Sequence, residues 1–130
     1  MAKVAFLSEA WLELQRSLGA DLPERPGASA VVQHIVTGTP DGEVRFVHTT
    51  VDGRTTALTV GGDDAPDVTF THTHADAQAI ARGELDLRVG FMRGSTKMAG
   101  DMGKVLALMA VVSSDEHRAQ LAAASKQTAY

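Results

Sequence analysis

The segment Phe91–Leu108, FMRGSTKMAGDMGKVLAL, holds the residue types whose spacing most suggests chemistry. Glycines, a Gly-Lys pair and a following apolar run are typical of a phosphate-binding loop that opens a helix. The spacing argues against that loop, because Met98 stands where its first glycine belongs and Val105 where its metal-binding hydroxyl belongs. The glycines also miss the dinucleotide-binding spacing. We interpret them as corners between a helix, a strand and a second helix.

Histidine is the second residue type with chemical potential, and the chain has five. His72 and His74 are two residues apart near the end of a predicted strand, where both rings could hold one metal ion. No carboxylate or cysteine stands at a spacing that completes such a set. His34 and His48 lie in predicted strands among Val and Phe residues, which favours a structural role. His117 falls in the first turn of a predicted helix, where we expect it to be exposed.

Covalent catalysis has little support in the sequence. There is no Gly-x-Ser-x-Gly elbow, no Ser-His-Asp spacing and no cysteine. Only His34 and His72 qualify for testing as a catalytic pair. The acidic loop GGDD at 61–64 could attract a cation, but we interpret it as a link between strands. We therefore predict no catalytic residues, no metal site and no cofactor.

Length and composition narrow the class of protein. The chain has 130 residues, which suggests a single domain over 1–130. Its net charge is −4 and its basic residues are dispersed, which argues against a nucleic-acid partner and a polybasic membrane patch. No apolar run approaches the roughly 18 residues of a transmembrane helix, so we expect no stable membrane insertion. The lack of cysteine fits a reducing compartment.

The elements that must position these residues follow from periodicity. Leu7, Trp11, Leu14 and Leu18 have helical spacing, which predicts an amphipathic helix ending near Gly19. Alternating and β-branched runs predict strands over 31–38, 44–51, 54–60, 67–73 and 95–99. Polar residues suited to capping predict further helices that begin after Thr73, Asp86, Asp101 and Ser113.

This order of elements predicts an α+β fold with a mostly antiparallel sheet covered on one face. Methionine and aromatic residues gather around the last predicted strand and the helix that follows it. Plain core packing explains such a cluster. Methionine is equally typical of adaptable apolar binding sites, so a cavity remains an alternative.

The segment Ala81–Leu108 contains, in order, Gly83, Leu85-Asp86, Gly90-Phe91-Met92, Gly94, Lys97, Gly100-Asp101 and Lys104. At these positions it resembles the signature of the sterol carrier protein type 2 domain. The preceding run DVTFTHTHADAQAI also fits the strand and helix that come before the signature. One departure is Leu87, where the family often has proline. That change affects the start of a helix rather than a ligand contact.

The resemblance implies a five-stranded sheet backed by about five helices, with an apolar tunnel between them. It also implies non-catalytic binding and carriage of a lipid, such as a sterol, a fatty acid or a fatty acyl-CoA. His72 is a candidate contact for the lipid head group, and the last, Ala-rich helix is a candidate lid. The candidate tunnel-lining residues are Trp11, Phe70, Ile80, Phe91, Met98, Met102, Leu106 and Met109.

Two other functions stay open from the sequence. The chain could be a substrate-holding accessory subunit or an enzyme of lipid or steroid catabolism, or it could be a protein-interaction module with a filled core. The C-terminal residues SKQTAY carry no peroxisomal tripeptide, and the Ala-, Asp- and Arg-rich composition is typical of bacteria. We therefore expect a bacterial protein of the cytoplasm.

Overall fold

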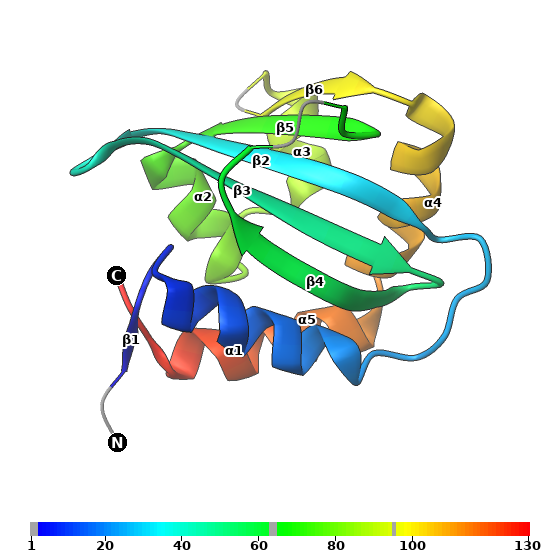
Figure 1. The fold of residues 1–130 in the computed structure, drawn as a ribbon, viewed down its shortest axis with the longest axis horizontal. Coiled ribbons are helices and arrows are strands. Elements are labelled where there is room, and N and C mark those ends of the chain that lie inside the picture. The colour runs from blue at the N-terminus through cyan, green and yellow to red at the C-terminus, as the bar shows by residue number, and fades with distance from the viewer. Residues whose placement is uncertain (1–2, 63–64, 95) are drawn as a thin grey trace.

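A five-stranded mixed sheet forms the centre of the computed structural model, which describes residues 3–62, 65–94 and 96–130 (Figure 1). Its strands lie in the order β4-β3-β2-β5-β6. Among the described strands of this sheet, β2 and β5 pair in parallel and the other neighbours are antiparallel. The strands are β2 (Ala30–Thr39), β3 (Gly42–Val51), β4 (Arg54–Val60), β5 (Val68–Thr73) and β6 (Lys97–Gly100).

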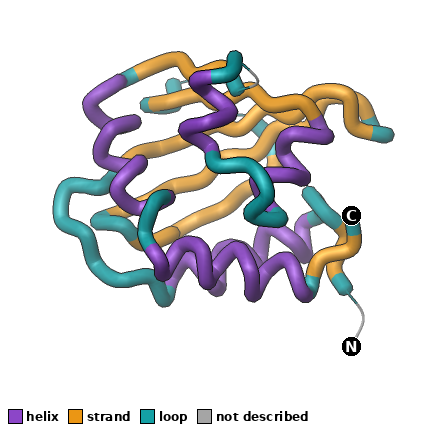
Figure 2. Tube along the Cα trace, turned by 180° about the vertical axis from the view of Figure 1, so that it is seen from behind, coloured by secondary structure: helices purple, strands orange, loops and turns teal. Residues whose placement is uncertain are grey.

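In the described residues, five helices cover one face of this sheet, which confirms the predicted α+β fold. Figure 2 shows them in front of the strands when the molecule is seen from behind. They are α1 (Glu9–Ala20), α2 (His74–Ala81), α3 (Leu87–Met92), α4 (Met102–Val112) and α5 (Asp115–Lys126). In the described part of the chain, no helix is both long and apolar enough to cross a bilayer.

Two short strands, β1 (Val4–Ala5) and β7 (Thr128–Ala129), pair in parallel, so the segments near the two termini lie side by side (Figure 1). They were not predicted, since two residues carry no periodicity. The predicted fifth strand, 95–99, corresponds to β6, although Ser95 lies outside the described residues. The cation hypothesis for GGDD also falls partly outside them, because residues 63 and 64 are not described.

Side-chain caps fix where three of the helices begin, as the sequence predicts. The side chains of Thr73 and Asp86 accept hydrogen bonds from backbone N–H groups in the first turns of α2 and α3. Asp101 does the same for α4, where the N–H donor belongs to Lys104. These contacts satisfy N–H groups that have no partner inside a helix.

The predicted cap of α5 is wrong by one residue. Ser114, not Ser113, is the N-cap, and its hydroxyl accepts the backbone N–H of His117 at 3.2 Å. Ser113 instead ends α4 and donates its hydroxyl to the carbonyl of Met109 at 2.6 Å. Two adjacent serines offer the same capping chemistry, so sequence alone does not choose between them.

The core lies between the sheet and the helices. In β5 the alternate residues Val68, Phe70 and His72 are buried, as the period of two predicts. Three apolar clusters result among the described residues, and two of them join the sheet to a helix. One joins β2 and β5 to α4, through Val105 and Leu108 among others. The second joins α1 to β2 and β3, and its members are Trp11, Leu12, Val36 and Phe46.

Two glycines are required by close approach of the backbone. Gly100 has φ +122°, and a Cβ there would clash with the carbonyl oxygen of Asp67 on the neighbouring segment. Gly19 brings α1 so close to edge strand β4 that a Cβ would clash with the side chain of Thr55. Both positions are therefore geometric requirements of the fold.

Candidate functional site

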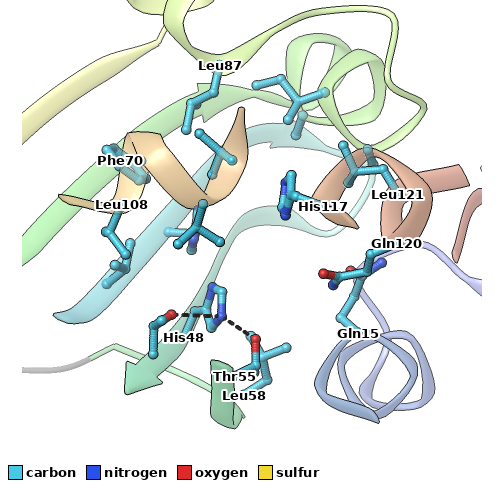
Figure 3. Close-up of a pocket in the computed structure, with 18 of the residues that line it drawn as sticks. Gln15, His48, Thr55, Leu58, Phe70, Leu87, Leu108, His117, Gln120 and Leu121 are labelled. Atoms are coloured by element: carbon cyan, nitrogen blue, oxygen red, sulfur yellow. Dashed lines mark hydrogen bonds between the residues drawn. The ribbon is translucent and has the colours of Figure 1, made fainter. Parts of the chain in front are cut away.

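A cavity of about 290 Å³ lies between the inner face of the sheet and the helices (Figure 3). Its sheet wall comes from alternate residues of β2, β3 and β5 and from β4, and its other walls come from all five helices and the segments next to them. Most of the lining is apolar, so the cavity suits a largely apolar occupant. The apolar lining includes Leu7, Val32, Val36, Phe46, Leu58, Leu85, Leu87, Leu108, Val111, Val112 and Leu121.

Five of the candidate ligand-contacting residues lie on this cavity. Trp11 comes from α1, Ile80 from α2 and Met109 from α4, while Phe70 and His72 come from the inward face of β5. The structure thus brings together residues separated by almost the whole chain. Figure 3 shows Phe70 and Leu108 on the same side of the pocket, where β5 and α4 meet.

The other four candidates lie outside the cavity lining. Leu106 is 73% exposed, and Phe91 and Met102 are about half exposed, at 48% and 49%. Met98 lies opposite Phe70 on edge strand β6 and packs on the core cluster of β5 and α4. This placement differs from the expected lining, because the four candidates follow the methionine-rich stretch of the sequence rather than one wall of the cavity.

The rotation of α4 explains part of this difference. Its buried residues are Val105, Leu108 and Val111, so Met102 and Leu106 point toward solvent. Nearly every residue of MGKVLALMAVV is apolar, so its periodicity does not define a single inward face. The packing against β5 chooses that face.

Several polar lining residues were missed or misplaced by sequence reasoning. His34 and His48 face the cavity from β2 and β3, whereas the sequence favours a structural role for them. The sequence predicts an exposed His117, but this residue is only partly exposed and lines the cavity from α5 (Figure 3). The positions 117, 120, 121 and 124 have helical i, i+3, i+4, i+7 spacing, which was the signal available for this inward face.

The imidazoles of the sheet wall form a row across three strands. The ring centroids of His34 and His72 are 5.7 Å apart, and those of His34 and His48 are 6.3 Å apart, with nearly parallel planes in both pairs. His34 Nδ1 lies 3.4 Å from His72 Nε2, and His72 Nδ1 lies 3.2 Å from the hydroxyl of Thr96. The row is thus tied together by its own side chains.

The third imidazole of this row has hydroxyl partners. His48 Nε2 lies 2.9 Å from the hydroxyl of Thr55 (Figure 3). It also lies 3.3 Å from the hydroxyl of Thr50. Both threonines belong to the inward faces of their strands, next to a register shift between β3 and β4. The polar atoms of this wall therefore hold one another in place.

These imidazoles are uncharged at neutral pH. Burial lowers the pKa of His48 and of His72 to about 4. Burial and the neighbouring imidazoles, His72 and then His48, lower the pKa of His34 well below its ordinary value. Burial also lowers the pKa of His117. The cavity therefore offers neutral hydrogen-bonding groups rather than positive charge.

The metal hypothesis for His72 and His74 finds no geometric support. His74 is the first residue of α2, and its ring contacts Phe6 and Gln78 rather than the cavity row. Among the described residues, no three His, Cys, Asp or Glu side chains come together in a way that could hold a metal ion. The imidazoles among the described lining residues lie near one another, but they are not arranged to hold a metal ion.

Fold and site together define an α+β protein with an apolar cavity between a sheet and its helix layer. The chain belongs to the SCP-2 sterol transfer family, whose model matches residues 12–113. This membership confirms the family resemblance of the segment 81–108. No curated protein matches the sequence significantly.

Solved structures support the same fold. A crystal structure of sterol carrier protein 2 has a TM-score of 0.68 and 17% identity, over 95% of this chain and 99% of that one. The solution structure of palmitated SCP2L2 from Aedes aegypti has a TM-score of 0.64 and 23% identity, over 82% and 94%. A sec-alkylsulfatase from Pseudomonas has a TM-score of 0.51 and 24% identity, over 68% of this chain but 14% of that one.

Proposed function

We propose that this chain binds and carries a lipid in the cavity between sheet and helices, without chemical conversion of the lipid. The observation that carries the proposal is the cavity itself, which is about 290 Å³ in volume and lined mainly by apolar side chains from the sheet and all five helices. Ligand pockets of proteins begin at about this size. Family membership and the palmitated relative from Aedes aegypti support a fatty acid, a fatty acyl-CoA or a sterol as the occupant.

The apolar lining accounts for affinity without much selectivity. Each methylene that leaves water contributes about 0.8 kcal/mol before the costs of association are subtracted. Trp11, Phe70, Ile80 and Met109 are the proposed contacts for the apolar body of the ligand, and His72 is a proposed polar contact. In this proposal residues 1–130 work as one lipid-binding domain in the cytoplasm, and the tunnel is this cavity with an opening to solvent.

A matched pair of variants on one helix tests the site. Met109 lines the cavity, whereas Leu106 is 73% exposed and lies outside the cavity lining. Met109→Arg should weaken binding of a fluorescent fatty acid by more than about tenfold, because it places a charge among apolar groups. Leu106→Arg should leave the dissociation constant within about twofold of the parent.

Circular dichroism and thermal melting must show that both variants are folded. If folded Met109→Arg binds as tightly as the parent, the cavity is not the site. If both folded variants lose binding equally, the exposed face of α4 is involved and the assignment also fails. Native mass spectrometry of the parent protein, followed by extraction, identifies any lipid that co-purifies.

A second function is favoured by one observation, the contact of His34 with His72 inside the cavity. A buried neutral imidazole can act as a general base, and the Pseudomonas sec-alkylsulfatase contains a region of similar fold. The second proposal is therefore an enzyme, or a substrate-holding subunit, of lipid catabolism. An interaction module with a filled core is less favoured, because this cavity is open space in the core.

Thioester hydrolysis is a direct test of the enzyme proposal. The chain has no cysteine, so a thiol reagent added with a long-chain fatty acyl-CoA reports only released coenzyme A. Release that is lost in His72→Ala, while acyl-CoA binding persists, supports catalysis. A parent protein that binds acyl-CoA and releases no thiol supports the carrier proposal for this ligand.

A further inference from the structure

Polar side chains lie on two sides of this otherwise apolar cavity. The sheet side carries the row of His48, His34 and His72. The helix side carries His117 and Gln120 of α5, together with Gln15 of α1, whose amide accepts a hydrogen bond from Gln120 at 3.5 Å. Figure 3 shows His117 and Gln120 on the α5 side of the pocket and His48 on the sheet side. These polar side chains would not contribute to the binding of a plain hydrocarbon chain.

Hydrogen-bonding capacity on the helix side is not used within the protein. Trp11 Nε1, His117 Nδ1 and Gln120 Oε1 are buried and have no protein hydrogen-bond partner among the described residues. All three residues line the cavity, and Trp11 is only 7% exposed. A buried polar atom without a partner is destabilising. An occupant that supplies a hydrogen-bonding group here is therefore favoured over plain hydrocarbon.

The electrostatics of the cavity favour an uncharged group. Among the described lining residues, the side chains that carry charge at neutral pH are Asp86 and Arg118. Asp86 is paired with Arg88 at 3.1 Å, and exposed Arg118 is paired with Asp115 at 3.4 Å. A carboxylate placed between the imidazoles would be buried without a cation. A hydroxyl or a ketone meets no such penalty.

Imidazole is suited to an uncharged oxygen, because its two nitrogens can donate or accept according to the tautomer. A hydroxyl can donate to one imidazole nitrogen and accept from an imidazole N–H, whereas a ketone can only accept from an imidazole N–H. His117 of α5 and His48 of β3 both line this cavity, on its helix side and its sheet side (Figure 3). Both imidazoles can therefore contact a ligand that lies between them in the cavity.

From this arrangement we infer that the lipid carries an uncharged oxygen, a hydroxyl or a ketone, on its apolar body. The oxygen lies between the imidazole row of the sheet and the polar side chains His117 and Gln120 of α5. This inference rests on the proposed lipid-binding function, and it adds the chemical class of the ligand. A charged head group, where there is one, stays at the rim of the cavity near Arg118.

The test compares ligands that differ only in this oxygen. Stearic acid and its mid-chain hydroxy and keto derivatives have the same chain length and carboxylate, so their difference in affinity reports the oxygen alone. Each displaces a fluorescent fatty acid from the purified protein. The hydroxy or the keto acid should bind about tenfold more tightly than stearic acid, because its oxygen gains partners. A purely apolar cavity gives the opposite order.

Two leucine variants locate the effect. His117→Leu should abolish or reverse the preference for the oxygenated acids. His74→Leu makes the same substitution at a histidine outside the cavity lining, and should keep the preference. Circular dichroism checks folding, and Gln120→Leu takes the place of His117→Leu where the latter does not fold.

The outcomes separate the two proposals. Equal binding of all three acids, or tighter binding of stearic acid, overturns the oxygen inference and leaves lipid binding intact. A preference that survives in both His117→Leu and Gln120→Leu overturns the assigned site. Binding of none of the acids, and of no other lipid extracted by native mass spectrometry, overturns the proposed function itself.

Discussion

Two regions of this molecule invite opposite interpretations from their composition. The segment Phe91–Leu108 is rich in methionine and glycine and matches the family signature, and it contains four of the nine candidate ligand contacts. The second region consists of the inward faces of β2 and β3 and of helix α5. The two strands have ordinary strand patterns, and α5 is rich in alanine. Yet these elements line the cavity with His34, His48 and His117, while Phe91 and Leu106 face solvent.

The difference teaches that a signature segment can serve geometry more than ligand contact. In 91–108, Gly94 ends α3 with φ +77°, and Gly100 turns the chain beside Asp67. Asp101 then caps α4. These residues set where α4 lies, and α4 then presents Leu108 and Met109 to the cavity. The histidine-bearing elements provide the polar chemistry of the site.

The first prediction concerns how the stability of the protein depends on pH, because only one of the two regions contains histidines. Residues 91–108 contain no histidine, whereas the cavity holds four. The pKa of His48 and of His72 is about 4 in the folded protein and about 6.5 when unfolded, so the unfolded chain binds more protons between these values. Stability is therefore complete above about pH 6.5 and falls as pH decreases toward 4.

In this window each of these two histidines lowers the free energy of unfolding by about 1.4 kcal/mol for each pH unit of acidification. Urea denaturation should show a loss of about 4 kcal/mol in the free energy of unfolding between about pH 7.5 and pH 5. His34 and His117 act in the same direction, since burial lowers the pKa of both. His48→Gln should reduce the slope. A stability that does not change over this range would mean that the imidazoles are already charged or hydrated in the folded state.

The second prediction concerns the geometric role of 91–108. Gly100→Val should destabilise the protein by about 3 kcal/mol, because the side chain meets the Asp67 carbonyl in a backbone conformation that favours glycine. Gly94→Ala is the matched control. Its φ is also positive, but a Cβ there has open space, so only about 1 kcal/mol is expected. Equal losses in urea denaturation would show that close approach at Gly100 is unimportant.

The third prediction uses two leucines on α4. Leu108 is 8% exposed and packs in the core cluster, whereas Leu106 is 73% exposed. Leu108→Ala should lower the free energy of unfolding by about 2 kcal/mol, at the low end for buried leucine because a cavity already borders the site. Leu106→Ala should change it by less than about 0.5 kcal/mol. The reverse order would show that Leu106, a candidate lining residue, lies on the inward face of α4 in place of Leu108.

Much of the fold was predictable because its signals are local. The caps Thr73, Asp86 and Asp101 and the alternation of β5 each depend on a few neighbouring residues. Such signals define the elements and their order. The same reasoning placed Phe70 and His72 on the inward face of β5, where both line the cavity.

The site was less predictable because it depends on contacts between distant residues. Parallel pairing of β2 with β5 puts Val36 beside His72, and so brings His34 and His72 together across 38 residues of sequence. No local sequence pattern predicts the pairing of β2 with β5. The rotation of α4 is likewise decided by packing, because its apolar residues surround most of the helix.

The fourth and smallest prediction concerns the start of α5, where sequence and structure differ by one residue. The Ser114 hydroxyl accepts the N–H of His117, so Ser114→Ala should cost about 1 kcal/mol. Ser113→Ala removes only a hydroxyl that donates to the Met109 carbonyl at the end of α4, and should cost less.

Urea denaturation of both variants measures this difference, and fatty-acid binding gives a second measurement. Ser114 holds the first turn of α5, and that turn carries His117 into the cavity. Ser114→Ala should therefore weaken the preference for oxygenated fatty acids, whereas Ser113→Ala should keep it. If Ser113→Ala has the larger effect on both measurements, α5 begins at the residue that the sequence predicted. In that case the face that carries His117 is rotated away from the position described above.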